Sequence, residues 1–525
     1  MNGHNPSGVW PPKYTETTLD KPLPVPYLTN DTGARDIRVG RQLFVDDWLI
    51  RDSSLDREFH QPSVHHTPVF QPETGLELND GECPCACPFN DGVFFDDQDG
   101  RYKMWYQSGW FDGTCYAESA DGIHWNRREG RIIPRPSDTL RDGGSVWLDY
   151  DAENPAERYK MLLFFRKFPH PVRGFLDMPK HFHDRPGCVP PHEEAVLFAS
   201  GDGLDWRPMT TTGPCGDNTT FHYDPFRKKW VFSLRTFSAL DSRVRTRGYI
   251  ELDHARFFEG AQWREKDIRF WSRTDICDLP DSGLGHYPQL YNLDATPYES
   301  LMLGLFGVFL GPPNFVCERT GQPKVIDLKL AFSRDGFHWH RPSYEPFLAA
   351  SSNLGYLHAC GGVCLVVGDE LRFYFSTWSG ESPKLGKHMY AGGSVGLATL
   401  RRDGFASLTD RGCGGQLVTH MLCYQGNSLF VNAVGEIRAE LLDEEMRTLP
   451  GFSREDCLPT ASDGTCQQLT WRGASMEQLG GRPLRIRFLL RDARLYSFWI
   501  TSDAQGRSGG YMAAGGPGFT KGRDV

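Results

Sequence analysis

Short runs rich in apolar and aromatic residues recur along most of this chain, separated by glycine, proline, asparagine or aspartate. The unit Ser119-Ala-Asp-Gly-Ile-His-Trp125 lies between two such runs. Related units occupy 200–206 and 333–339, and residues 402–405 keep only the Asp-Gly part of the unit. An Asp-Gly pair between apolar runs is a strong hairpin signal, because a two-residue type I′ turn needs positive φ at both central positions. The pattern therefore predicts strands joined by hairpins, with each tryptophan packed beneath its turn.

A longer period groups these hairpins into larger units. Each unit reads as four strands with an aromatic-rich second strand, and these second strands cover 101–106, 158–165, 229–234, 299–306 and 371–378. Four-stranded units that repeat at roughly 40–70 residues are typical of a β-propeller, which leaves few exposed strand edges. We predict an all-β chain with an arm over 1–40 and a five-bladed propeller over 41–410. Beyond residue 410, period-two alternation predicts an antiparallel β-sandwich over 411–525, whose Gly-rich tail would lie on the surface.

Composition narrows the range of functions. The net charge is −10 with no basic stripe, which argues against a nucleic-acid partner, and no apolar run is long enough to span a membrane. The N-terminus lacks the pattern of a signal peptide, so we expect a cytoplasmic protein whose 14 cysteines are free thiols. Neither Cys83-Pro-Cys-Ala-Cys87 nor His181-Phe-His183 has the spacing of a zinc site, so we expect no metal and no cofactor.

Polar residues occupy equivalent positions in the five units, where the first strand of each blade begins. In a propeller these positions line the central channel and open on one face. The polar residues at these positions are Asn90 and Asp91, Asp142, Asp217 and Asn218, His286, and His358. A single aspartate at such a place is commonly a turn or cap residue. Three carboxylates that converge from consecutive blades instead indicate a catalytic pocket, because clustered carboxylates push their pKa values apart.

Longer motifs point to a known group of enzymes. They are Leu43-Phe-Val-Asp-Asp-Trp-Leu-Ile50, Tyr102-Lys-Met-Trp-Tyr106, the Ser-x-Asp-Gly-x-x-Trp turns, and the stretches 451–456 and 495–499. With these motifs the chain resembles the five-bladed propeller glycosidases of the invertase, levanase and arabinanase type, and most closely their uncharacterised "family 32 N-terminal-like" relatives. The resemblance implies hydrolysis of a glycosidic bond, a furanoside among the options, by acidic residues on the first three blades.

The same resemblance assigns roles to the carboxylates. Asp91 and Asp142 correspond in position to the nucleophile or base and to the transition-state stabiliser, and Asp217 completes the acidic ring. The invertase-type Trp-Met-Asn-Asp-Pro-Asn motif is absent, and blade three offers Asp217 where a glutamate acid is expected. A glycosidase needs one protonated and one ionised carboxyl group. The candidates for the general acid are therefore Glu77, Glu193 and Glu194.

Further residues are candidates for substrate contact. Arg235, Arg243, Arg245 and Arg247 border the predicted open face. Guanidinium groups suit carboxylate or sulfate groups, so these arginines either recognise a charged sugar or form ordinary surface ion pairs. We expect Arg235 to bind substrate together with Asn90, Asn218, His286 and His358. Trp110 and Trp378 either stack on sugar rings or pack in the core. Asp47 either contacts substrate or ties the first strand to the closing blade.

The sequence is also compatible with two other functions. A phosphorylase on the same fold would use inorganic phosphate, which the blade-three arginines could hold. A glycan-binding propeller would keep the aromatic residues and lack catalysis. All three readings make a carbohydrate the partner, and self-association through a sandwich edge and the arm stays open.

Overall fold

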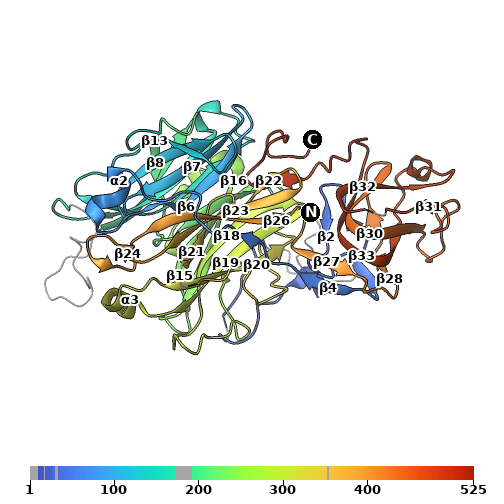
Figure 1. The fold of residues 1–525 in the computed structure, drawn as a ribbon, viewed down its shortest axis with the longest axis horizontal. Helices are drawn as coiled ribbons and strands as arrows, with labels where there is room; N and C mark the ends of the chain where they lie inside the picture. The colour runs from blue at the N-terminus through green and yellow to red at the C-terminus, as the bar shows by residue number, and fades with distance from the viewer. Residues whose placement is uncertain (1–9, 17, 30–32, 173–191, 352–353, 461) are drawn as a thin grey trace.

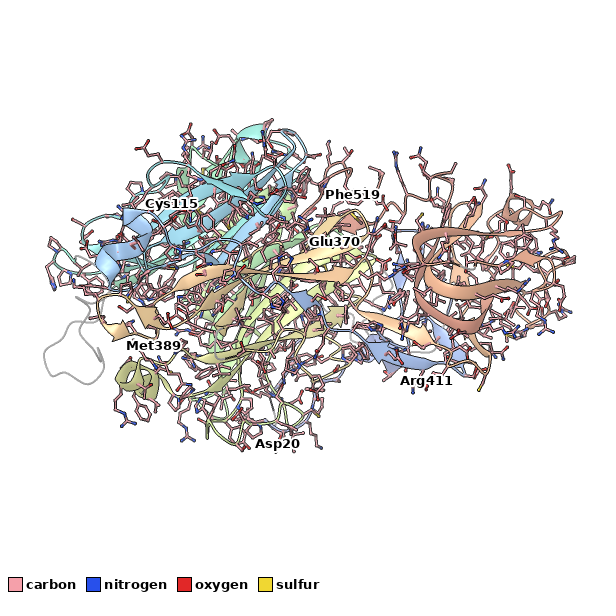
Figure 2. The ribbon with its side chains drawn as sticks, viewed as in Figure 1. Asp20, Cys115, Glu370, Met389, Arg411 and Phe519 are labelled. Atoms are coloured by element: carbon pink, nitrogen blue, oxygen red, sulfur yellow. The ribbon has the colours of Figure 1, made fainter. Side chains whose placement is uncertain are left out.

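The structure, a computed structural model, describes residues 10–16, 18–29, 33–172, 192–351, 354–460 and 462–525. Two β-rich lobes lie side by side, a propeller and a smaller lobe built largely from the C-terminal strands (Figure 1). Side chains fill both lobes, and Arg411 lies at the lower edge of the smaller lobe (Figure 2). Within the described residues, no helix is long and apolar enough to cross a membrane.

Blades one to three each contain four antiparallel strands in sequence order. Blade one comprises β6 (Ala86–Asp96), β7 (Arg101–Ser108), β8 (Gly113–Ser119) and β9 (Trp125–Arg127). Blade two comprises β10 (Thr139–Leu148), β11 (Tyr159–Lys167), β12 (His192–Ser200) and β13 (Arg207–Thr211). Blade three comprises β14 (Thr220–Asp224), β15 (Lys229–Phe237), β16 (Arg245–Asp253) and β17 (Arg269–Ser272). The first strands contact one another around the ring, so they form its inner wall.

Blades four and five complete the ring, which confirms the predicted five-bladed propeller. Blade four contains β18 (Gln289–Glu299), β19 (Leu301–Gly311) and β20 (Val325–Ser333), and short bridges from 340 and 348 extend its outer edge. Blade five contains β21 (Gly355–Ala359), β22 (Leu365–Val367), β23 (Glu370–Trp378) and β26 (Gly393–Arg401). Its outermost strand is β5 (Ser63–Val64), which precedes blade one in the chain. Strand β5 thus ties the two ends of the propeller together.

The repeated Asp-Gly turns form as predicted but with a different geometry. Gly122, Gly203 and Gly336 have φ between +76° and +81°, whereas the aspartates before them are not in the left-handed region. Each aspartate side chain instead accepts hydrogen bonds from the backbone amides two and three residues further on, as Asp121 Oδ1 does from Ile123 and His124, both at 2.8 Å. The prediction of type I′ turns is therefore wrong. The aspartate side chain stabilises the turn, so only the glycine, and not the aspartate, needs a positive φ.

The C-terminal lobe is a β-sandwich whose strands belong to one hydrogen-bonded, nine-stranded sheet. Its longest members are β30 (Ser428–Leu442) and β33 (Arg485–Thr501), and shorter ones are β27 (Ala406–Thr409), β28 (Gly415–Thr419), β31 (Cys457–Leu458) and β32 (Gly464–Trp471). The strands β2 (Gln42–Leu43), β3 (Ile50–Ser53) and β4 (Asp56–Phe59) also pair here. The three strands within residues 42–59, expected in the propeller, therefore belong to the sandwich sheet. Phe44, Trp48 and Leu49 pack in the sandwich core, whereas Leu43 and Val45 pack against blades four and five.

The Gly-rich tail does not lie loosely on the surface. Strand β34 (Tyr511–Met512) pairs with the C-terminal end of the inner strand β18, and Ala514 O accepts a hydrogen bond from Phe95 N at 2.9 Å. In Figure 2 the tail residue Phe519 lies near Glu370, the first residue of β23. The tail thus crosses the ends of the inner strands that are opposite the predicted site, which leaves the other ends for chemistry.

Short helices complete the described fold and contribute little to it. They are α1 (Pro26–Thr29), α2 (Gly75–Leu78) and α3 (Asn314–Thr320). Two small ladders lie outside the blades and the sandwich, one between β1 (Arg35–Asp36) and β29 (Leu422–Cys423) and one between β24 (Glu381–Ser382) and β25 (Gly386–Lys387).

Candidate active site

The inner strands are irregular at the end where the polar residues were predicted. Register shifts occur between Cys87 and Gly92, Arg141 and Gly144, Leu290 and Asn292, and Gly355 and His358. In blade three the irregularity precedes β14, where Asn218 has a φ of +57°. A bulge turns a side chain away from the regular alternation and is common beside active sites. All five blades thus present off-pattern side chains at one end of the channel.

Asn90 connects four of the five blades at this end. Its Nδ2 donates to Asn218 Oδ1 at 3.1 Å, and its Oδ1 accepts from Asn292 Nδ2 at 3.2 Å and lies 3.1 Å from His358 Nδ1. Asn90, Asn218 and His358, all predicted to bind substrate, therefore lie together. They are buried and form hydrogen bonds with one another, so they stabilise the bottom of the site rather than face solvent. Burial lowers the pKa of His358 well below its ordinary value, which keeps the ring neutral.

Arg166, at the end of β11, gathers three predicted carboxylates. Its Nη2 lies 2.7 Å from Asp142 Oδ2 and 3.0 Å from Asp217 Oδ2, and its Nη1 pairs with Glu193. Arg235 Nη1 contacts Asp217 from the other side at 2.7 Å. The prediction that Asp142, Asp217, Glu193 and Arg235 share one site is consistent with these contacts. Arg166 was missed, although it directly follows the aromatic run that marks the second strand of blade two.

Asp142 and Asp217 share Arg166 but have different electrostatic environments. Burial raises the pKa of Asp142 to about 6 against the opposing charge of Arg166, and the nearby Asp217 raises it further. Burial would also raise the pKa of Asp217, but Arg235 and Arg166 outweigh it, so that pKa is lowered. The side chain of Asp217 is 23% exposed and that of Asp142 is 6% exposed. Asp142 therefore stays protonated up to a higher pH than Asp217 does.

A cavity lies beside Arg235, on the blade-three side of the site. A surface cavity of about 690 Å³ is lined by Gly216 and Arg235, which flank Asp217, and by Cys215, Thr236 and Phe237. A Cβ at Gly216 would lie 2.6 Å from Arg235 Nε, so glycine at this position lets the guanidinium reach Asp217. Neither Asp142 nor Asp217 lines this cavity, which meets the site only at Gly216 and Arg235.

Asp91, the predicted nucleophile or base, is enclosed. It is 0% exposed, and its Oδ1 pairs with Arg141, which is also buried. Burial raises the pKa of Asp91 to about 6, although Arg141 opposes the shift. A Cβ at Gly144 would lie 2.0 Å from Asp91 Oδ1, so this glycine makes room for the pair between β6 and β10. Asp91 is therefore placed to support the wall of the site rather than to touch a ligand.

Glu77 is not a general acid in this structure. It is a buried residue of α2, and its Oε2 accepts from the backbone amides of Glu73 and Thr74 at 2.8 and 3.0 Å. Its Oε1 accepts from Tyr106 Oη at 2.8 Å and Arg127 Nε at 2.9 Å. All lone pairs of the carboxylate are thus engaged in fixing α2 against β7 and β9, and this prediction is wrong.

Several other candidates also occupy structural positions. Asp47 is exposed and pairs with Arg57 near the sandwich, away from the propeller channel, so its predicted substrate contact is wrong. Glu194 pairs with Lys167. Trp110 and Trp378 are fully buried and pack edge to face with ring centroids 5.5 Å apart, so the core alternative holds for both. His286 lies at the edge of the site, 3.1 Å from Gln289 Nε2.

The four arginines of blade three separate into distinct environments. Arg235 contacts Asp217, whereas Arg243 is exposed and pairs with Asp241 beside it in the chain. Arg247 is fully buried, and its Nη2 and Nη1 donate to the carbonyls of Asn218 at 2.8 Å and Tyr291 at 3.2 Å. Arg247 therefore holds the irregular backbone of two blades in place.

Comparisons with known proteins add little at the level of sequence. No protein-family model and no curated protein matches the chain. A solved N-acetylgalactosamine deacetylase from F. plautii, in complex with blood group B trisaccharide, is 13% identical over 66% of this chain and 96% of its own, with a TM-score of 0.43. A thermostable family-43 glycoside hydrolase is 12% identical over 61% of this chain and 93% of its own, with a TM-score of 0.40.

A third solved structure, a fructofuranosidase variant from Schwanniomyces occidentalis with fructosylnystose, covers more of the chain. It is 10% identical over 82% of this chain and 96% of its own, with a TM-score of 0.38. All three likenesses are weak in identity and in TM-score. The propeller assignment therefore rests on the strand pairing described above.

Proposed function

We propose that this chain is a glycoside hydrolase in which Asp142 is the general acid and Asp217 the ionised partner. The observation that carries the proposal is that both carboxyl groups contact one nitrogen of Arg166 while their pKa values are shifted in opposite directions. A protonated and an ionised carboxyl group on either side of the scissile bond are the requirement for glycoside hydrolysis.

The spacing of the two groups favours a two-step reaction with retention. Asp142 Oδ2 and Asp217 Oδ2 lie 2.7 and 3.0 Å from the same Arg166 Nη2, so they are at most about 5.7 Å apart. Retaining enzymes hold their carboxyl groups about 5–5.5 Å apart, whereas inverting enzymes need about 6.5–9.5 Å to admit a water molecule. In this mechanism Asp217 attacks the anomeric carbon while Asp142 protonates the leaving oxygen. Asp142 then takes a proton from the water that releases the sugar.

The arginines support each step. Arg235 and Arg166 keep Asp217 ionised and oriented, as a nucleophile needs. Glu193 shares Arg166 and stands at the exposed rim of the site, where it can contact the leaving part of a substrate. The catalytic aspartates come from blades two and three, whereas Asp91 of blade one supports them from within the wall.

The test is a screen of the purified protein against aryl furanosides, aryl pyranosides and oligosaccharides, with and without phosphate. We expect release without phosphate, with NMR showing that the first-formed sugar keeps the anomeric configuration of the substrate. Release only with phosphate would favour a phosphorylase that uses the arginines of the site. Binding to a glycan with no release would favour a binding propeller, and an inverted product would contradict Asp217 as nucleophile.

The activity should depend on pH through the general acid. Because the pKa of Asp142 is raised to about 6 and only the protonated form donates, kcat/KM should fall about tenfold per unit as pH rises above 6. Asp217, with its lowered pKa, should stay ionised across this range. A pH–rate profile of the wild type checks this, and a profile flat from pH 5 to 9 would contradict the assignment of Asp142.

A further inference from the structure

A tyrosine on the blade-four side of the site lies between two cations. Tyr291 occupies the bulge of β18, and its ring centroid is 5.0 Å from Arg245 Cζ and 5.0 Å from Lys324 Nζ. Lys324 Nζ donates to Tyr291 Oη at 2.9 Å, and Tyr356 Oη lies 3.1 Å from the same phenol oxygen. Arg245 is the first residue of β16, Lys324 directly precedes β20, and Tyr356 is the second residue of β21. The cluster therefore lies at the same end of the blades as the candidate site.

Neither cation has a carboxylate partner within ion-pair distance among the described residues. Lys324 is 2% exposed; it donates to the phenols of Tyr291 and Tyr356, and the Tyr390 ring also lies beside it. Arg245 Nη1 contacts Gln289 Oε1 at 3.4 Å. Burial of a cation without an anion is costly, and two like charges around one ring add to that cost. The simplest explanation is that Lys324 and Arg245 bind an anionic group of a ligand.

The neighbouring carboxylates do not serve as that anion, because they are already engaged. Asp217 is paired with Arg235 and Arg166, and Asp142 with Arg166. Lys324 and Arg245 nevertheless act on Asp217 through space, so they lie beside the proposed catalytic pair. Burial would raise the pKa of Tyr291, yet Lys324 and Arg245 lower it. Lys324 and Arg245 thus make the surroundings of the Tyr291 phenol positive.

We propose that Lys324, Arg245 and Tyr291 form a subsite for an acidic group on the sugar, so the substrate is an anionic glycoside. The acidic group is a carboxylate, as in a uronic acid, or a sulfate ester; both offer oxygens that suit a guanidinium, an ammonium and a phenol. This inference rests on the proposed hydrolase for turnover, but not for binding. It places the charged substituent toward blade four, while the scissile bond lies between Asp142 and Asp217 on blades two and three.

The experiment compares matched acidic and neutral sugars on the wild type and three variants. The variants are Lys324→Met, Arg245→Gln and, as a control with the same substitution, Arg243→Gln, whose side chain is exposed and paired with Asp241. Turnover is measured on aryl uronides, aryl glycoside sulfates and the matching neutral aryl glycosides. Binding of free uronic acids, sulfated sugars and neutral sugars is measured by calorimetry, so that the two sources of the anion are separated.

We expect one acidic class to be turned over or bound at least about a hundredfold better than its neutral match. Lys324→Met and Arg245→Gln should each lower that preference about tenfold or more, whereas Arg243→Gln should leave it unchanged. Arg245 is half-buried, so its variant keeps the test valid if Lys324→Met fails to fold. Added salt should weaken the preference, because part of it is electrostatic attraction.

The outcomes separate the two proposals. Hydrolysis without preference for an acidic sugar would overturn the anionic subsite and leave the hydrolase standing. Binding of an acidic sugar that depends on Lys324 or Arg245, without hydrolysis of any substrate, would support the subsite and overturn the hydrolase. A preference for acidic sugars that is unchanged in both variants would also overturn the subsite.

Discussion

Replacing Asp217 with asparagine should lower kcat/KM about a thousandfold or more, because the amide cannot attack the anomeric carbon. The substitution removes one negative charge from between Arg235 and Arg166 but keeps the size of the side chain. Asp142→Asn should cause a similar loss on substrates with poor leaving groups and a smaller loss on aryl glycosides, whose leaving groups need little protonation. Initial rates on one poor and one good leaving group measure both effects.

Two controls make this result specific. Asp205→Asn makes the same change at an exposed turn of blade two and should retain wild-type activity. Azide should restore turnover to Asp217→Ala and give a glycosyl azide of inverted configuration, because the small anion takes the place of the missing nucleophile. If Asp217→Asn were as active as Asp205→Asn, the proposed mechanism would be wrong.

The propeller could be predicted because its signals are local. The aspartates of the Ser-x-Asp-Gly-x-x-Trp turns bond to amides two and three residues away, so each turn is specified by its own sequence. The pairing of β5 with blade five and of β2 with the sandwich could not be predicted in this way. These contacts join segments hundreds of residues apart, and two-residue or four-residue strands carry no period of their own.

The site was predictable only in part for the same reason. Asp142, Asp217 and Asn90 follow from the repeat, because equivalent positions of a propeller meet at the channel. Lys324 and Tyr291 do not, since their importance arises from contact between blades and from a bulge that turns Tyr291 toward the site. Glu77 was misread although a local signal was present: Thr74-Gly-Leu-Glu77 has the spacing of a capping box, and the structure forms one.

Replacing Arg141 with methionine should lower the apparent free energy of unfolding by about 3–5 kcal/mol near pH 8, because it leaves the Asp91 carboxylate buried without a partner. Asp91 and Arg141 are both almost fully buried, and their contact lies in the wall between β6 and β10. The loss should be smaller near pH 5. Burial already raises the pKa of Asp91 to about 6, and removal of Arg141 raises it further, so the carboxyl group can be protonated in the folded state at low pH.

Chemical denaturation at pH 5 and pH 8, followed by tryptophan fluorescence, measures this difference. The double variant Asp91→Leu/Arg141→Met removes both charges and should regain most of the stability, because an apolar pair of similar volume avoids the cost of a buried lone charge. The single variant Asp91→Asn distinguishes the two roles considered for this residue. If Asp91→Asn abolished activity while the protein kept wild-type stability, Asp91 would belong to the catalytic machinery; lost stability with retained activity is expected from its position in the wall.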